Sequence, residues 1–591
     1  MRGFNKIVNY GATADHSNRQ YARWLQLYEQ TSKLQRETAM RRIMSIPEHP
    51  LISILLPIYN TDQKWLTEAI ASCQAQHYPN WELCIADDAS TLPEVHALLK
   101  ALATADERIK LVIRNHQGVA EALNSALDIA HGDWVTLLGH TDRLAENALY
   151  NLALAATRHI DAQIIYSDED KLDEDGHRFA PYFKCDWNQD LFYSRNFLAH
   201  LCAYRGSLIK AHRFNAGMDG AHDYDLALRC IEHISPKHIV HIPSVLYHWR
   251  THHNSIVSEA LMPAERALNK HFQRKNLKAC IESTPHGFRI KYPLPRIPPL
   301  VSLIIPSRNA LNLLRQCIDS ICTKTTYPNY EIIIIDNGSD DTEVLNYFKS
   351  IAAHPNISVI HDDRPFNYSA LNNRAANVAR GELIALLNND IEVITPEWLG
   401  EMVSQALRPE IGAVGAKLLY PDNTVQHGGI VLGIGGCAGH AHKGLPRDSS
   451  GYFYRAQLVS NFSAVTAACL VVRKSVFDEV GGLDETNLAV AFNDVDFCLR
   501  LIKAGYRNLW TPYAELYHHE SATRGRDDTP EQKARLASEE AYMKATWGDW
   551  IRNDPAYNPN LTLEHENFSL AYPPRDGLFI QKRKVAKLTY D

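Results

Sequence analysis

The ten residues Gly381-Glu-Leu-Ile-Ala-Leu-Leu-Asn-Asn-Asp390 decide the fold of this chain. A short apolar run, Leu383 to Leu387, ends abruptly in two amides and one carboxylate. Such a run is typical of a buried strand in a parallel sheet, which delivers side chains to its carboxyl end. Open α/β sheets bind ligands at that edge. Because carboxylate and amide oxygens suit Mg²⁺ or Mn²⁺, the stretch predicts a cation site there.

A near copy of this stretch, Gly132-Asp-Trp-Val-Thr-Leu-Leu-Gly-His-Thr141, lies upstream. Gly381 follows Gly132 by 249 positions. Four further pairs keep the same spacing: Pro57 and Pro306, Asn60 and Asn309, Pro79 and Pro328, Asp87 and Asp336. A constant spacing across five landmarks indicates an internal duplication, and at this period the repeat is a whole domain.

Strands alternate with helices in both copies, which predicts βαβ units on mostly parallel sheets and an α/β fold class. The expected order is a helical N-terminal arm (1–50), a first domain (51–285), a Pro-rich linker (286–299), a second domain (300–545) and a C-terminal extension (546–591). Tyr21 and Trp24 belong to a partial helical stripe in the arm, which we expect to serve packing alone.

Composition narrows the class of protein. The chain has 591 residues, a net charge of -7 and 45% hydrophobic residues. A nucleic-acid binder usually shows a basic face, so we expect no nucleic-acid partner. Since no stretch has the form of a signal peptide or a membrane span, we expect a cytoplasmic protein.

Several motifs together resemble family 2 glycosyltransferases with the GT-A fold, the Rossmann-like fold of nucleotide-diphospho-sugar transferases. The motifs are Pro306-Ser-Arg-Asn309, Asp336-Asn-Gly-Ser339, Leu387-Asn-Asn-Asp390, Asn493-Asp-Val-Asp-Phe-Cys-Leu-Arg500 and Tyr517-His-His-Glu520. The resemblance covers residues 51–280 and 300–545, so it implies two tandem GT-A domains. Other phrases resemble the branch that builds O-antigens and rhamnose-containing polysaccharides: Pro365-Phe-Asn-Tyr-Ser369, Val465-Thr-Ala-Ala-Cys-Leu470, Gly481-Gly-Leu-Asp-Glu485 and Asp554-Pro-Ala-Tyr-Asn-Pro-Asn560.

The resemblance implies a nucleotide diphosphate sugar, linked to dTDP or UDP, as donor. Asp336 would accept the imide N–H of a uracil or thymine ring, since a carboxylate is a strong acceptor. The remaining donor-side residues would be Pro306, Arg308, Asn309, Asn388 and Asn389. Asn388 takes the place of a carboxylate in the family's Asp-x-Asp motif, and an amide is the weaker ligand.

The same resemblance assigns the metal and the base. Asp390 and His518 would hold a divalent cation, Mn²⁺ or Mg²⁺, with His519 as the adjacent alternative. Asp494 would act as the catalytic base, with Asp496 supporting it. One base and one metal, without a second nucleophile, imply inversion at the anomeric carbon. Arg524 would reach the diphosphate from a lid, although a surface arginine is almost as good an interpretation.

Two other patterns in the second repeat have plainer interpretations. The histidines His427, His440 and His442 have no Cys or acidic partner at zinc spacing, so we expect loop histidines near the acceptor groove. The glycine-rich stretch 433–439 lacks the acidic residue of a dinucleotide site, and we expect a flexible acceptor-side loop.

The first repeat has lost the metal carboxylates, because Gly139 and Thr141 stand where the family has Asp. Its retained counterparts are Asp87, Asp223 and His248. We expect this domain to be weak or inactive and to act as a scaffold or an acceptor-chain holder. His140 and Asp142 are two apart and leave an improvised site open.

We therefore expect an inverting transferase that adds a sugar, first guess rhamnose, to an oligosaccharide or lipid-linked acceptor of a surface polysaccharide such as O-antigen. Two alternatives stay open: a bifunctional enzyme in which both domains transfer sugars, and a non-catalytic carbohydrate-binding or assembly protein. The basic segment 582–587 beside apolar residues 578–580 favours membrane contact and a solvated terminus about equally.

Overall fold

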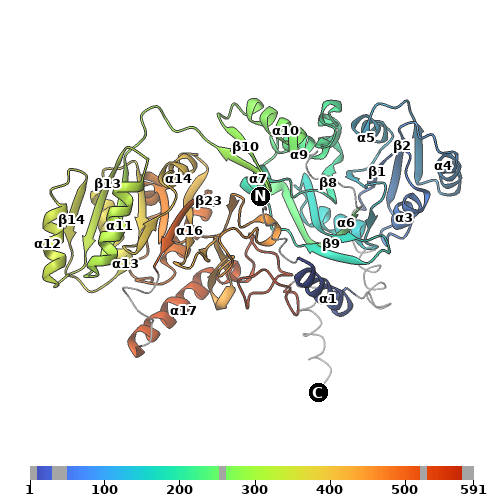
Figure 1. Ribbon diagram of the computed structural model, residues 1–591. Helices are drawn as coiled ribbons and strands as arrows, with labels where there is room; N and C mark the ends of the chain where they lie inside the picture. The colour runs from blue at the N-terminus through green and yellow to red at the C-terminus, as the bar shows by residue number, and fades with distance from the viewer. Residues whose placement is uncertain (1–9, 30–48, 252–260, 520–528, 576–591) are drawn as a thin grey trace, which may run out of the picture.

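A computed structural model describes residues 10–29, 49–251, 261–519 and 529–575. The chain folds into two lobes, each built on one large sheet, with α1 and α17 on the same side of the molecule (Figure 1). Apolar residues of each large sheet belong to two separate core clusters. Each lobe is therefore a layered α/β domain with a core on both faces of its sheet.

The first lobe and the arm contain these elements in chain order: α1 (Tyr10–Tyr28), β1 (Ile52–Ile58), α3 (Gln63–Gln74), β2 (Trp81–Asp87), α4 (Pro93–Ala105), β3 (Ile109–Ile113), α5 (Val119–Asp128), β4 (Trp134–Leu137), β5 (Arg143–Leu144), α6 (Ala148–Arg158), β6 (Ile164–Leu172), β7 (Arg178–Tyr182), α7 (Gln189–Ser194), β8 (Cys202–Arg205), α8 (Gly206–His212), α9 (His222–Ile231), β9 (Ile239–Arg250), α10 (Leu261–Arg274), β10 (Cys280–Thr284) and β11 (Gly287–Lys291).

The second lobe and the extension continue with β12 (Val301–Ser307), α11 (Leu311–Lys324), β13 (Tyr330–Asp336), α12 (Thr342–Ile351), β14 (Ile357–His361), α13 (Tyr368–Val378), β15 (Leu383–Leu387), β16 (Ile391–Val393), α14 (Trp398–Ala406), β17 (Ile411–Leu419), β18 (Val425–His427), β19 (Ile430–Leu432), β20 (Ala438–His440), β21 (Ser460–Asn461), β22 (Cys469–Arg473), α15 (Lys474–Glu479), α16 (Asn493–Lys503), β23 (Arg507–His518) and α17 (Pro530–Arg552).

The two large sheets share one topology. Their strand orders are β3-β2-β1-β4-β8-β6-β9-β5 and β14-β13-β12-β15-β22-β17-β23-β16, which match position by position. The first four strands of each order are parallel, and β8 and β22 join them antiparallel. The α/β fold class and the duplication are confirmed, and the predicted apolar strand 383–387 is β15, buried along its whole length.

The duplication extends to the side chains that contact Gly381 and Gly132. Gly381 N donates to Ser302 Oγ at 2.9 Å, and Ser302 Oγ donates to Glu331 Oε1 at 2.6 Å. The first repeat has the same chain of bonds, with Ser53 Oγ 2.8 Å from Gly132 N. A Cβ on Gly381 would meet Ser302 N at 2.7 Å, so only glycine fits this approach of two strands.

The arm and the extension join the lobes. Trp24 on α1 is buried and donates from Nε1 to the carbonyl of Ala571 at 3.1 Å. From the extension, Asn558 Nδ2 donates to Asp168 in the first lobe at 2.9 Å. The stripe on α1 therefore packs against both the first lobe and the extension.

Two expected boundaries move. Residues 287–291, expected as part of the linker, form β11, which pairs with β10. Phe288 in β11 is buried in an apolar core of the first lobe. The boundary expected at residue 545 falls inside α17, which runs to Arg552. The linker is shorter than expected because Phe288 and Ile290 of β11 pack inward. The prolines that follow β11 favoured an extended linker over a strand in the sequence.

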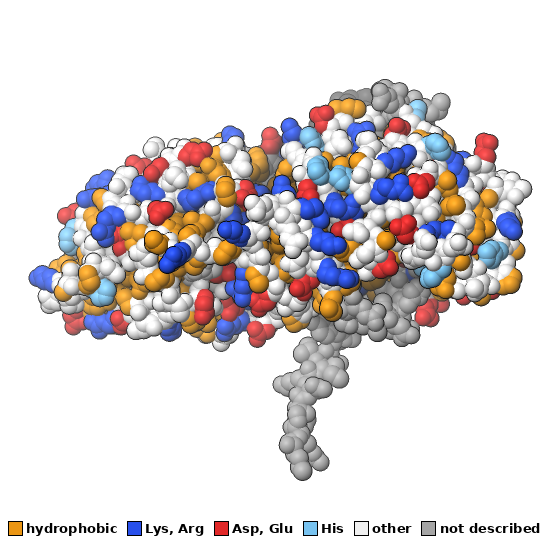
Figure 2. Space-filling view, turned by 90° about the horizontal axis from the view of Figure 1, so that it is seen from above, with side chains coloured by type: hydrophobic (Ala, Val, Ile, Leu, Met, Phe, Trp, Pro, Cys, Tyr) orange, Lys and Arg blue, Asp and Glu red, His pale blue; other side chains and the backbone are white. Residues whose placement is uncertain are grey.

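Figure 2 shows Lys and Arg side chains interspersed with Asp and Glu over the upper face. This mixture agrees with the net charge of -7. Within the described residues, no helix is long and apolar enough to cross a membrane.

Candidate active site

The carboxyl end of β15 brings a carboxylate and an imidazole together. Asp390 follows β15, and β16 pairs antiparallel with β23 so that Ile391 lies opposite His518. Asp390 Oδ1 is 3.2 Å from His518 Nε2, and both side chains are buried. His519 turns toward Glu392 Oε2 at 3.4 Å instead. The strand register therefore places His518, and not its neighbour, beside the carboxylate.

The donor set here fits a divalent cation. Asp390 Oδ1 is buried and accepts no hydrogen bond from any described residue. An unpaired buried carboxylate oxygen is costly unless a cation or donor compensates it. Carboxylate oxygen suits Mg²⁺ and Mn²⁺, and imidazole is a common transition-metal ligand. The pair of Asp390 with His518 therefore has the chemistry of a divalent-cation site.

The two amides before Asp390 diverge. Asn388 Nδ2 lies 3.2 Å from His518 Nε2, and its Oδ1 accepts from the Tyr368 hydroxyl at 3.3 Å. Asn389 Nδ2 instead donates to Ser307 Oγ on β12 at 3.2 Å. Asn388 thus extends the carboxylate–imidazole cluster, while Asn389 turns toward β12.

Asp494 is held by the loop of residues 464–468. It lies in the first turn of α16, and its Oδ2 accepts from Ala467 N at 3.0 Å. The Ala467 carbonyl accepts from the Tyr368 hydroxyl at 3.2 Å, and the next carbonyl accepts from Asn388 N at 3.1 Å. One loop therefore ties the predicted base to the predicted cation edge.

Tyr368 is a site residue that sequence reasoning missed. It opens α13, whose first turn is capped by Asn367 Oδ1 accepting from Ala370 N at 2.9 Å. Burial raises the pKa of Tyr368, and the Asp494 and Asp390 charges add to this effect. Its hydroxyl therefore stays protonated and donates. The phrase Pro365–Ser369 marked this region without giving Tyr368 a role.

Asp496 has a supporting position. Its Oδ2 accepts from Arg500 Nε at 2.8 Å, and its Oδ1 accepts from Trp547 Nε1 on α17 at 2.8 Å. Both oxygens are therefore occupied, and the residue fastens α16 to α17 beside Asp494.

On the donor side, Asp336 ends β13 and is buried. Its Oδ1 accepts from Ser339 N at 3.1 Å, and its Oδ2 lies 3.0 Å from His361 Nδ1. Asn309 Nδ2 donates to Asp340 Oδ1 at 2.9 Å, so this amide braces the loop after β13. At the same edge, Pro306 is half-buried in β12 and Arg308 is exposed. Arg524 lies outside the described residues.

The histidines His427, His440 and His442 are more buried than loop histidines would be. His427 Nδ1 is 3.2 Å from His440 Nδ1, and its Nε2 accepts from Thr466 N at 3.4 Å. Burial lowers the pKa of His427 well below its ordinary value, with His440 and His518 adding to the shift. His427 is therefore neutral and contacts the 464–468 loop through Thr466 N.

The other acceptor-side expectations are only partly met. His442 is buried and stacks on Phe568, with ring centroids 4.5 Å apart. The stretch 433–439 connects β19 and β20, which pair as a hairpin, and Gly436 approaches Glu540 on α17. Glycines alone suggested flexibility, but Ile434 and Cys437 within the stretch are buried.

In the first repeat, His140 and Asp142 have different partners. Asp142 accepts from the Tyr247 hydroxyl at 2.6 Å and from Arg250 N at 2.9 Å, both on β9. His140 Nδ1 lies 3.0 Å from Thr61 Oγ1.

His248 contacts a carboxylate on another strand than its counterpart His518, which lies beside Asp390. Its Nδ1 lies 2.6 Å from Asp170 Oδ1 on β6. Asp170 Oδ2 further accepts from the Tyr21 hydroxyl on α1 at 2.7 Å and from Arg178 Nε at 2.5 Å. Burial alone would raise the pKa of Asp170, but His248 and Arg178 outweigh it and lower that pKa. Arg178 and Tyr21 of the arm thus satisfy the buried carboxylate of Asp170.

The other first-repeat counterparts keep their places. Asp87 ends β2 and accepts from Ser90 N at 3.0 Å, as Asp336 does from Ser339. Asp223 lies in the first turn of α9, and its Oδ2 accepts from Asn196 Nδ2 at 3.1 Å.

Comparisons with known proteins identify the family of this chain. A family model described as glycosyl transferase family 2 matches residues 53–212 and 302–481. Uncharacterized protein y4gI of Sinorhizobium fredii is 48% identical over 89% of this chain and 59% of its own length. O-antigen biosynthesis protein RfbC of Myxococcus xanthus is 38% identical over 93% of this chain and 43% of its own. The chain thus spans about half the length of these two relatives.

A third relative is shorter. An N-acetylglucosaminyl-diphospho-decaprenol L-rhamnosyltransferase of Mycobacterium tuberculosis is 26% identical over 40% of this chain and 82% of its own length. The family resemblance seen in the motifs is confirmed.

Proposed function

This chain belongs to glycosyltransferase family 2, and from that premise we propose that its second repeat transfers a sugar from a nucleotide diphosphate donor to a saccharide acceptor of a bacterial surface polysaccharide. The observation that carries the proposal is the convergence of Asp390, His518 and Asp494 on one sheet edge through the 464–468 loop. Rhamnose from a thymidine diphosphate donor is the first candidate. One relative is named an L-rhamnosyltransferase, which supports the sugar, and another is named an O-antigen biosynthesis protein, which supports the polysaccharide.

Asp390 and His518, with Asn388 beside them, would hold the divalent cation, which when bound neutralises charge on the leaving diphosphate. Asp336 would orient the base of the nucleotide by accepting its imide N–H. Its present contact with the exposed His361 ring can give way, because that side chain is 61% exposed.

Asp494 would take the proton of the attacking hydroxyl. As the acceptor oxygen bonds to the anomeric carbon, the bond from that carbon to the diphosphate oxygen breaks, and the nucleoside diphosphate leaves with the bonding electrons. Ala467 N fixes Asp494 Oδ2 while further lone pairs of the carboxylate stay available. A single displacement of this kind inverts the anomeric carbon.

The first repeat would not catalyse transfer. Thr141 replaces the cation carboxylate, and Asp142 and His248 are bound elsewhere. The role of the first repeat would be structural.

If the acceptor is lipid-linked, the protein would also contact the inner face of the membrane.

The test is donor turnover. Purified protein is incubated with Mn²⁺ and a panel of dTDP- and UDP-linked sugars, and release of nucleoside diphosphate is measured. We expect one donor class to be cleaved, Asp494→Asn and Asp390→Asn to abolish cleavage, and Asp142→Asn to leave it unchanged. When a saccharide acceptor is added, NMR of the glycoside formed should show an inverted anomeric configuration. Activity that survives Asp390→Asn would contradict the proposal.

A further inference from the structure

The second repeat sends a segment, residues 452–461, into the first repeat, and we call it the wedge. The Tyr452 hydroxyl accepts from Phe183 N at 2.8 Å. The Phe453 ring stacks on Tyr182, with centroids 3.9 Å apart and planes at 15°. The Tyr454 ring stacks on His286 at 4.7 Å. Three consecutive aromatic residues of one repeat thus contact the other.

The backbone of the wedge is strained where these rings insert. Phe453 and Tyr454 have φ values of 46° and 69°, in the left-handed region that bulky residues rarely adopt. Such conformations persist only where surrounding contacts hold them. Contacts with the first repeat, together with the stacking of Tyr452 on Phe568 in the extension, therefore keep the wedge in this shape.

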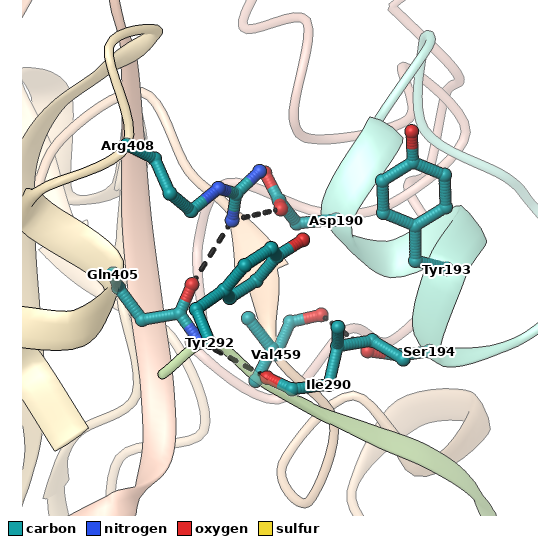
Figure 3. Close-up of a pocket in the computed structure, with 8 residues that line it drawn as sticks. All are labelled: Asp190, Tyr193, Ser194, Ile290, Tyr292, Gln405, Arg408 and Val459. Carbon is teal, nitrogen blue, oxygen red and sulfur yellow. Dashed lines mark hydrogen bonds and ion pairs between the residues drawn. The ribbon is translucent and has the colours of Figure 1, made fainter. Parts of the chain in front are cut away.

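The far end of the wedge is fixed by polar contacts. Asn461 N donates to Asn188 Oδ1 at 3.0 Å, and Asn188 Nδ2 donates back to the Asn461 carbonyl at 2.9 Å. Asn461 Nδ2 donates to Asp190 Oδ2 at 2.8 Å, and Asp190 Oδ1 accepts from Arg408 at 2.6 Å. Figure 3 shows Arg408 reaching across to Asp190 beside Tyr292.

This junction is tightly packed. The cavity drawn in Figure 3 has a volume of about 10 Å³, room for one water molecule at most. Burial alone would raise the pKa of Asp190, but Arg408 and Arg507 outweigh it and lower that pKa. Leu458 in the wedge is itself a member of the first repeat's apolar core. The wedge is therefore anchored along its whole length.

The wedge leads directly into the loop that holds the reaction site. Two residues separate Asn461 from the 464–468 loop, which binds Asp494, Tyr368 and Asn388. We infer, on the basis of the proposed function, that the first repeat is a positioning platform: through Tyr182 and Asn188 it fixes the wedge, and the wedge fixes the loop that aims the base of the second repeat. The first repeat, in which Thr141 replaces the cation carboxylate, thereby sets the geometry of the reaction site in the second repeat.

The test compares Tyr182→Ala with Tyr182→Phe, which keeps the stacked ring, and with Tyr59→Ala. Tyr59 is the control because it also stacks, on His116, but in the loop that follows β1. Hydrogen–deuterium exchange is followed in peptides that cover residues 462–470. UDP and dTDP are titrated with Mn²⁺ by calorimetry, and turnover is measured with the donor found by the panel.

We expect Tyr182→Ala to speed exchange in these peptides roughly tenfold by local opening, and to lower turnover more than fivefold while nucleotide affinity stays within about twofold. Tyr182→Phe and Tyr59→Ala should match wild type. Unchanged exchange in Tyr182→Ala, or an equal loss in Tyr182→Phe, overturns the inference. If Tyr182→Ala does not fold, Phe453→Leu tests the same stack. Failure of wild type to bind either nucleotide would instead refute the proposed function, and the exchange comparison would still stand.

Discussion

His241 is buried between two carboxylates where the first lobe meets the C-terminal extension. Its Nε2 lies 2.8 Å from Asp168 Oδ1 and its Nδ1 lies 3.0 Å from Asp186 Oδ1. Asp168 also accepts from Asn558 of the extension. Burial lowers the pKa of His241, but Asp168 and then Asp186 outweigh it and raise the pKa to about 9. The imidazolium therefore belongs to the folded state at neutral pH.

The sign and size of its contribution follow from this shift. The folded pKa of about 9 exceeds the ordinary value of 6.5, so the stabilisation is complete below pH 6.5 and is lost as pH rises through 9. At 1.36 kcal/mol per unit of pKa, this difference corresponds to about 3 kcal/mol. If the first lobe melts as one unit, the melting temperature changes by about 6–12 °C.

Scanning calorimetry of wild type and His241→Gln, between pH 6.5 and about 9.5, measures this contribution. Wild type should lose melting temperature across the range, and the variant should start lower and lose much less. His177→Gln is the control, because the His177 side chain is 79% exposed. If His241→Gln falls as steeply as wild type, the buried pairing with Asp168 does not stabilise this junction.

Three further changes test other contacts. Tyr368→Phe removes the hydroxyl bonded to Ala467, so donor turnover should fall about tenfold with unchanged nucleotide binding in calorimetry; equal turnover would remove Tyr368 from the site. Trp547→Phe leaves Asp496 Oδ1 without its donor, which should cost about 1–3 kcal/mol in thermal unfolding; no loss would mean that α17 is not fastened there. Trp24→Ala empties a buried site worth about 3–5 kcal/mol, so limited proteolysis should release the arm faster than in wild type, and an equal rate would show that α1 is not held by packing.

The sequence was sufficient for the architecture because local patterns carried it. Leu383 to Leu387 is apolar between a glycine and three polar residues, and the structure buries it as β15. The constant spacing of 249 predicted two sheets with matching strand orders. The contact of Asp390 with His518 could also be predicted, because the family resemblance assigns both residues to one cation site.

Contacts that depend on distant, unpatterned residues were out of reach. The Asp170 carboxylate that binds His248 lies within β6, and its further partner Tyr21 lies on the arm. Neither residue belongs to a motif, so nothing local marked the pairing. The same holds for the stacking of Phe453 on Tyr182, which requires the packing of two complete domains.

Nucleotide binding by calorimetry in the presence of Mn²⁺ tests the central claim, that the second repeat alone carries the donor site. UDP and dTDP are titrated into wild type, Asp336→Ala and Asp87→Ala, the matched position in the first repeat. We predict one binding site that is lost with Asp336→Ala and kept with Asp87→Ala. Two sites, one lost with each variant, would contradict the account and identify an enzyme in which both repeats bind donors.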